Sequence, residues 1–233
     1  MSRAAQTRAL LPESWSREGS RLLFFPSAAG RPTPERPTLE ALRGRLTEVS
    51  GEQAAAALTL AVRWVVEAQS AGEMAVWLQS GDGLLYPPDL ADAHVDLDRL
   101  VVVRLPDADG IPRAGELLLR SGGVGLAVLD LLAPGACRDG PTGLTIRTVR
   151  PRRSGWMNRL LALAQTHEAG VVCLTATPDE EPSLASLVGL RLGPRLVRCR
   201  GGGFRLETTV LKDKRAQPHR SFQEGCRGPL GLR

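Results

Sequence analysis

Residues 46–57, LTEVSGEQAAAA, have the order of a phosphate-binding turn, in which a short apolar strand leads through a glycine into a helix. Such a turn reads G-x-x-x-x-G-K-[ST], because the lysine holds the phosphates and the hydroxyl holds Mg²⁺. Here Gly51 is followed by Glu52, Gln53 and four alanines, and no lysine precedes Lys212. A helix N-terminus can still face an anion. Without the cation and the metal ligand, however, we expect neither tight ATP binding nor hydrolysis.

A basic segment at residues 145–159, TIRTVRPRRSGWMNR, could contact nucleic acid, since it contains no acidic residue. Arginine pairs with phosphates, and a tryptophan can stack on a base. The candidate DNA-binding residues are Arg147, Arg150, Arg152, Arg153, Trp156 and Arg159. The alternative is a solvated loop whose arginines only keep the protein soluble.

The composition sets limits on the class of protein. The 233 residues suffice for one medium domain with arms, and the net charge of +5 permits an acidic partner or nucleic acid. The four cysteines form no C-x-x-C pair, which argues against a zinc site or a disulfide scaffold. No segment has the length and hydrophobicity of a signal peptide or a membrane span, so we expect a cytoplasmic protein without membrane contact.

Alternating apolar segments predict an α/β fold with a mainly parallel central sheet, flanked by helices, and antiparallel strands at one edge. Parallel strands are expected at 46–50, 74–79, 99–105, 124–132 and 171–177. The third of these is continuously apolar and is expected to be buried. Helices are expected after Gly51, at 112–123 and at 154–170, and antiparallel strands within 186–215. The first helix should bury Leu58, Ala61, Val62, Val65 and Val66, which share one face.

Three parts of the chain follow from this reading. Residues 1–45 form an N-terminal arm with a Pro-rich linker, RPTPERP, and residues 46–215 form the core. Residues 216–233 are rich in Gly, Pro and Arg without periodicity and are expected to be a flexible tail.

Several strings, in this order along the chain, resemble RecA-type recombinases over residues 46–218. AHVDLDRLVVVRLPDADG (93–110) is similar to the segment that carries the third strand of that family. LRSGGVGLAVLDLL (119–132) resembles the Walker B strand, and ETTVLKDKRAQP (207–218) resembles a late strand that ends in a Lys-x-Lys pair. The resemblance implies a RecA-like core.

The same resemblance implies a degenerate nucleotide site. Where the family has its loop lysine and hydroxyl, this chain has alanine, leucine or glutamine, depending on the alignment. Asp130 stands where the family orders Mg²⁺, Asp82 near its water-activating Glu, and Thr177 at its γ-phosphate-sensing Gln. The predicted remnant of the site comprises Gly51, Ala56, Ala57, Leu58, Asp82, Asp130 and Thr177. We expect no catalysis, no cofactor and no metal, and we favour for Asp130 the simpler role of a strand-end carboxylate that caps a turn.

Two further features resemble recombinase interfaces. Lys212 and Lys214 match the Lys-x-Lys pair, which in the family reaches the nucleotide of a neighbouring subunit. Phe25 and Ala28, in FPSA, match an F-x-x-A motif by which some recombinases dock on their neighbours. The alternatives are an ordinary charged strand end and a local hydrophobic anchor. The basic segment lies where the family has its first DNA-binding loop, whereas PDEEPSLAS (178–186) is acidic and unlike the second.

A RecA-like core with a degraded phosphate loop resembles the ImuA family of accessory factors in bacterial damage-induced mutagenesis. This resemblance implies RecA, the Y-family-like protein ImuB and an associated error-prone polymerase as partners, with single-stranded DNA as a further candidate. Three alternatives stay open: a SulA-like cell-division inhibitor that binds FtsZ, an active recombinase or ATPase, and a DNA-binding module.

Overall fold

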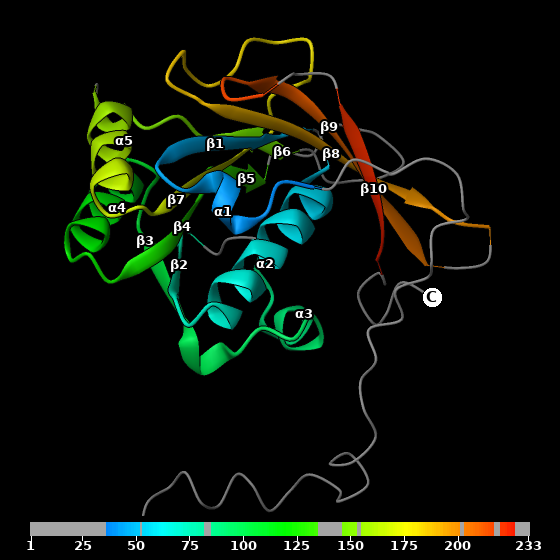
Figure 1. Cartoon of the computed structure of the whole chain (residues 1–233), viewed down its shortest axis with the longest axis horizontal. Coiled ribbons are helices and arrows are strands. Elements are labelled where there is room, and N and C mark those ends of the chain that lie inside the picture. The colour runs from blue at the N-terminus through cyan, green and yellow to red at the C-terminus, as the bar shows by residue number, and fades with distance from the viewer. Residues whose placement is uncertain are drawn as a thin grey trace, which may run out of the picture. The chain divides into compact units, whose positions relative to one another are not determined.

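An eight-stranded sheet forms the centre of the structure, a computed structural model that describes residues 36–51, 53–81, 85–134, 146–152, 155–200, 203–216 and 220–226 (Figure 1). Its strands run in the order β10-β9-β8-β1-β7-β4-β2-β3. They are β1 Arg45–Ser50, β2 Met74–Ser80, β3 Leu100–Leu105, β4 Val124–Asp130, β7 Gly170–Thr175, β8 Leu190–Arg198, β9 Phe204–Asp213 and β10 Ser221–Cys226. The strands from β8 to β3 are parallel, whereas β9 and β10 are antiparallel. The predicted fold class is confirmed.

Helices cover both faces of this sheet. They are α1 Leu39–Leu42, α2 Ala54–Ser70, α3 Pro87–Asp92, the 3₁₀ helix η4 Leu97–Arg99, α4 Gly110–Arg120 and α5 Trp156–Thr166. One hydrophobic cluster joins α2 to one face, and a second joins α4 and α5 to the other (Figure 1). A two-stranded sheet of β5 Leu132–Pro134 and β6 Ile146–Thr148 follows β4. None of the described helices has the length and hydrophobicity needed to cross a membrane.

The buried face of α2 agrees only in part with the predicted one, since Ala61, Val62 and Val65 are buried as expected but the other two residues are not. Leu58 and Val66 are only half-buried, whereas Ala57, Leu60 and Trp64 are fully buried. The Trp64 indole N–H donates to the Pro37 carbonyl at 2.8 Å. The prediction counted large aliphatic residues, but alanines let the helix lie close to the sheet and thereby rotate its buried face.

Strand β3 was predicted to be buried, and this is wrong. Among the described strands it pairs only with β2, at the edge of the sheet, and Val101 and Val102 are each 39% exposed. A continuous apolar run does not reveal whether a strand is central, because strand order depends on the crossover connections. The outer edge of β3 therefore presents unpaired backbone groups beside exposed apolar side chains.

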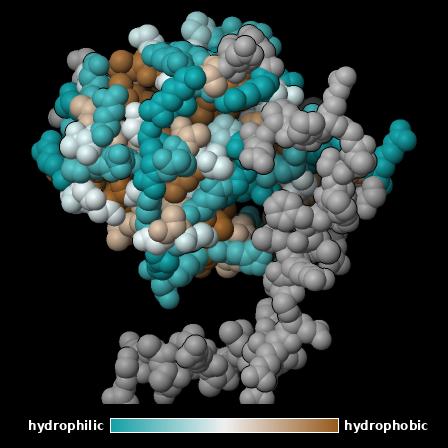
Figure 2. All heavy atoms as spheres, in the orientation of Figure 1, coloured by the Kyte–Doolittle hydropathy of each residue, from teal (hydrophilic) through white to brown (hydrophobic). Residues whose placement is uncertain are grey.

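The predicted flexible tail contains a strand. Residues Ser221–Cys226 form β10, which pairs with β9 and buries Phe222. Glu224 on β10 forms an ion pair with Arg63 on α2, with 3.0 Å between Oε2 and Nη1. One buried phenylalanine in six residues gives too weak an alternation for a prediction from sequence. On the face seen in Figure 2, hydrophilic residues are spread over the described surface, and hydrophobic ones are exposed between them in several small areas.

Candidate functional site

The turn at Gly51 connects β1 to α2 and is held by β7 and β8. Gly51 has a φ of +146°, which favours glycine, and its N–H donates to the Thr175 carbonyl at 3.2 Å. The Gln53 side chain accepts a hydrogen bond from the Leu196 amide at 2.8 Å. This bond fixes the start of α2 to the backbone of β8.

The first turn of α2 is packed into the core. Ala56 and Ala57 are fully buried, and their amides donate to the Gln53 carbonyl at 3.0 and 3.3 Å. They belong to the same hydrophobic cluster as Leu192 on β8. On the alignment that gives these two positions to the lysine and the hydroxyl of a phosphate loop, both lie inside the apolar core, where a long charged side chain would lose its hydration.

Asp130 is the last residue of β4 and is only 1% exposed. Its Oδ1 accepts a hydrogen bond from the Leu132 amide at 3.0 Å, which caps the turn into β5. The predicted structural role as a turn cap is therefore confirmed. Burial raises the pKa of Asp130 to about 6, although the Leu132 amide and the nearby Trp77 indole both lower it.

Asp130 belongs to a buried polar cluster whose hydrogen bonds are incomplete among the described residues. Gln79 lies beside it in register on β2, and Trp77 lies two residues earlier on the same face. Asp130 Oδ2, Trp77 Nε1 and both amide atoms of Gln79 lack a partner of normal geometry in the described part of the chain. These two donors and two acceptors are buried on the face of the sheet that α2 covers.

Most residues of the predicted nucleotide-site remnant lie at or after the carboxyl ends of the parallel strands. Gly51 follows β1, Asp130 ends β4, and Thr177 comes two residues after β7 and is 3% exposed. Leu58, one turn into α2, is half-buried. Asp82 lies outside the described residues.

A buried ion pair, which the sequence analysis missed, joins β1 to β8 on the opposite face of the sheet. Glu48 on β1 is fully buried, and its Oε2 lies 3.7 Å from Arg191 Nε on β8. Glu48 also accepts hydrogen bonds from Thr175 Oγ1 and from the Leu184 amide, both at 2.9 Å. The sequence does contain a signal for this pair, namely one acidic residue in LTEVS and one arginine in GLRLG, each within a buried strand.

This pair fixes the acidic segment 177–186 to the sheet. Arg191 donates to the carbonyls of Pro178 and Glu181, and to Ser50 Oγ. The segment has no helix or strand of its own. Its conformation therefore depends on side chains of β1 and β8.

Lys212 and Lys214 contact the same segment of their own chain. Both Nζ atoms donate to the Ser186 carbonyl, at 3.4 and 2.6 Å, and Lys212 also donates to Ser183 Oγ at 3.3 Å. Burial and the charge of Lys214 lower the pKa of Lys212. The predicted contact with a neighbouring subunit stays a prediction.

The basic segment is exposed in part. Arg147, Arg150 and Arg152 are exposed, and Arg153 lies outside the described residues. Trp156 is only 5% exposed and packs in the core, so its predicted role in stacking on a base is wrong. As the first residue of α5, it faces the sheet rather than the preceding loop. Arg159 forms an ion pair with Glu116 at 2.6 Å.

The remaining predicted features involve the arm and the cysteines. Phe25 and Ala28 lie outside the described residues. Within the described ranges, no three His, Cys, Asp or Glu residues are grouped closely enough to bind a metal ion. Cys173, Cys199 and Cys226 are free thiols.

Comparison with known proteins finds RecA. The RecA protein of Desulfotalea psychrophila is 32% identical over 136 residues, which cover 56% of this chain and 35% of that protein. The RecA protein of Heliobacterium modesticaldum is 30% identical over 138 residues, 58% of this chain and 38% of that protein. The RecA protein of Rippkaea orientalis is 26% identical over 200 residues, 82% of this chain and 53% of that protein.

The chain thus spans about a third to about half of the length of these curated relatives. No protein-family model matches it. The chain is thus distantly similar to RecA, as the resemblance predicted, and the finer assignment to the ImuA family stays a prediction.

Proposed function

We propose that this protein is a RecA-like accessory factor of the bacterial DNA-damage response that has no ATPase activity of its own. In this role, as in the ImuA family that it resembles, it binds RecA or an ImuB-type polymerase protein in the cytoplasm and supports error-prone translesion synthesis. The observation that carries the proposal is the start of α2. A RecA-like sheet is kept, but Ala56 and Ala57 are buried where the phosphate loop needs its cation and hydroxyl.

A protein-binding role is supported by the exposed edge of β3. Native sheets protect their edges with charges, prolines, bulges or covering elements. Here the edge sequence LVVVRL has no proline and only one charge, and Val101 and Val102 are both exposed. An added strand from a partner would pair the free backbone groups and cover these side chains.

The test is binding of the full chain to RecA by biolayer interferometry, with RecA free or as filaments on single-stranded DNA, and with or without ATP. Phe25→Ala examines the arm, and Phe24→Ala is its matched control. Val102→Lys examines the edge of β3, where a charge opposes strand addition. We expect binding at micromolar concentration or tighter. Loss in Phe25→Ala alone indicates docking through the arm, and loss in Val102→Lys alone indicates docking through β3.

Several results would contradict the proposal. No binding to RecA or to an ImuB-type protein under any of these conditions would remove the accessory role. Binding to FtsZ with inhibition of its polymerisation would support the SulA-like alternative. ATP turnover by the purified chain alone, abolished in Asp130→Asn, would indicate an active ATPase.

A further inference from the structure

Alternate residues of β3 direct their backbone N–H and C=O groups to the open edge of the sheet. The Gly81 amide donates to the Leu105 carbonyl at 3.0 Å, and Ser80 lies beside Leu105 in register, so Leu105 directs its backbone groups to β2. Neighbouring residues of a strand direct these groups to opposite sides. The residues whose backbone groups face the open edge are therefore Leu100, Val102 and Arg104. No described strand lies on that side of β3.

The side chains of these three residues share the face of the sheet that α2 covers. Leu100 packs against the hydrophobic cluster beneath α2, whereas Val103 packs against the cluster on the opposite face. Val102 lies in the middle of the edge and is exposed, as is Arg104. An exposed apolar strand edge pairs readily with another strand, which covers its side chains and satisfies its backbone groups.

Two charges of opposite sign lie at the two ends of β3. Asp98 precedes the strand in η4, and Arg104 lies near the end of the strand. Both side chains are exposed, and neither forms an ion pair with any residue in the described ranges. The two residues are roughly 15–20 Å apart along the strand, so they do not pair within one copy of the chain.

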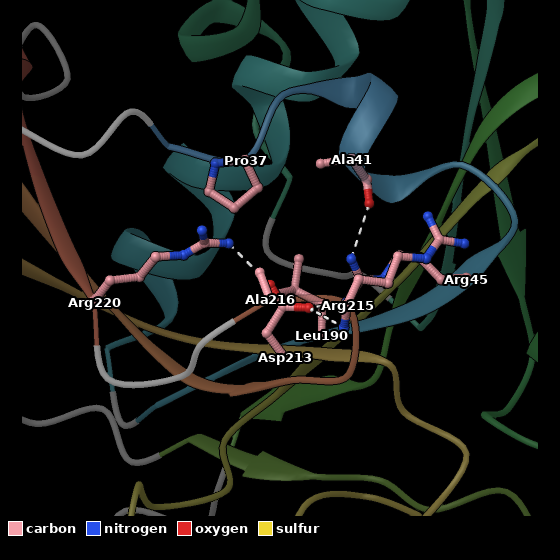
Figure 3. A pocket seen from close by; sticks show the side chains of 8 residues that line it. All are labelled: Pro37, Ala41, Arg45, Leu190, Asp213, Arg215, Ala216 and Arg220. Atoms are coloured by element: carbon pink, nitrogen blue, oxygen red, sulfur yellow. Dashed lines mark hydrogen bonds and ion pairs between the residues drawn. The ribbon is translucent and has the colours of Figure 1, made fainter.

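At the other end of the sheet, charges are balanced within the chain. Where β9 ends, Asp213 accepts hydrogen bonds from Arg45 at 2.7 Å and from Arg220 at 2.9 Å (Figure 3). On the edge strand β10, Glu224 pairs with Arg63 at 3.0 Å. Of the two edges of the sheet, β3 is therefore the one whose charges, among the described residues, still lack a partner.

A second copy of the chain offers β3 a complementary edge, because a two-fold axis perpendicular to the sheet sets the two strands antiparallel. With the axis at Val102, this residue lies opposite its own copy, and Leu100 of each chain lies opposite Arg104 of the other. All three pairs then exchange both backbone hydrogen bonds. Asp98 of each chain is diagonal to Arg104 of the other, a separation that a long side chain spans. An axis one residue away in either direction leaves one outward-facing residue without a strand partner.

We propose that two copies of this chain form a closed dimer in which their β3 edges pair antiparallel about a two-fold axis at Val102. The dimer covers both copies of Val102 and forms two ion pairs between Asp98 and Arg104 of different chains. Two six-residue strands make a small interface, so we expect a dissociation constant in roughly the micromolar range. The dimer goes beyond the proposed function, because it needs no other protein.

The test is sedimentation velocity of the full chain across the micromolar range, without any partner protein. We expect the wild type to convert from monomer to dimer as its concentration rises. Val102→Lys places two lysines opposite each other at the axis and should weaken the dimer by about tenfold or more. Val197→Lys is the matched control, because this valine is 36% exposed and pairs with Arg205 on β9, away from β3. It should dimerise like the wild type.

A charge exchange tests the register. Arg104→Asp brings like charges together in the dimer and should weaken it. The double variant Asp98→Arg/Arg104→Asp should restore it, and this recovery requires two copies because the residues are far apart in one chain. Thermal unfolding verifies that each variant is folded.

Four results would overturn the proposal: a monomer at all concentrations, a dimer that Val102→Lys leaves intact, a double variant as weak as Arg104→Asp, or species that grow beyond a dimer. Loss of the dimer in Phe25→Ala would also contradict it, because the arm and not β3 would then join the copies. RecA binding is measured separately, so failure of the dimer leaves the proposed function standing.

Discussion

Ionisation of the buried Asp130 should lower the stability of the folded state. Its folded-state pKa is about 6, against an ordinary value of 3.8. A carboxyl whose pKa is raised by folding stabilises the folded state most at a pH below 3.8. This contribution is lost as the pH rises through 6. At 1.36 kcal/mol per pKa unit, the whole effect is about 3 kcal/mol.

We therefore predict that Asp130→Asn removes a pH-dependent part of the stability. Asn is always neutral and keeps an oxygen for the Leu132 amide. Between pH 4.5 and 7.5 the free energy of unfolding of the wild type should fall by about 2 kcal/mol relative to Asp130→Asn. Urea unfolding at both pH values measures this difference. Asp92→Asn, at an exposed position on α3, is the control and should follow the wild type. Parallel behaviour of Asp130→Asn and wild type would show that Asp130 is not buried as described.

At the residue scale, the sequence was most informative about the functional groups that a phosphate loop needs and that are absent from this chain. The absence of a lysine between Met1 and Val210 was visible directly. Trp156 was misread because a tryptophan among arginines looks the same in sequence whether its ring is exposed or buried. Glu48 and Arg191 were missed because their pairing joins residues that are far apart in the chain.

The segment 177–186 shows, at the scale of elements, how a stretch without regular structure is held in one conformation. Arg191 binds its carbonyls, Glu48 binds the Leu184 amide, and Lys212 and Lys214 bind the Ser186 carbonyl. The sequence predicted only that this segment is short and acidic.

We predict that Arg191→Met destabilises the chain by about 3–5 kcal/mol, because Glu48 is left buried without a counter-charge. The double variant Glu48→Gln/Arg191→Met should recover part of this loss. Arg195→Met is the matched control. Its partner is Asp179, its side chain is 66% exposed, and it should cost less than about 1 kcal/mol. Urea unfolding gives the energies, and hydrogen exchange of residues 177–186 should rise in Arg191→Met. An equal cost for Arg191→Met and Arg195→Met would contradict this account.

Elements were predictable where their patterns are local. The parallel strands β1, β2, β3, β4 and β7 and the helices α2, α4 and α5 lie within a few residues of the predicted ranges. The sequence did not predict where each strand lies within the sheet. The run LVVVRL reads as a strand, but its place at the edge follows from the order in which the chain adds strands. Strand β10 is stable only because β9 offers it a paired edge, a partner that local sequence does not reveal.

At the scale of the whole molecule, the arginines that contribute to the net charge of +5 differ in whether an acidic side chain balances their charge. Many arginines are engaged in ion pairs: Arg36, Arg43, Arg45, Arg63, Arg159, Arg191, Arg195, Arg205 and Arg220. By contrast, Arg147 and Arg150 make no ion pair within the described ranges. Arg152 is 91% exposed and lies 4.0 Å from Asp109. These three side chains are available to an anionic partner.

We predict that the chain binds single-stranded DNA weakly through these three arginines, with a strong dependence on salt. Each phosphate contact contributes roughly 0.7 to the slope of log affinity against log salt, so the triple variant Arg147→Ala/Arg150→Ala/Arg152→Ala should lower the slope by about 2. Fluorescence anisotropy with a labelled oligonucleotide at several salt concentrations measures it. The control Arg104→Ala/Arg113→Ala/Arg120→Ala removes the same charge from other exposed positions. Equal losses in the two variants would mean that only net charge matters. Trp156→Phe should leave binding unchanged, because the ring packs in the core and does not reach the solvent-exposed segment.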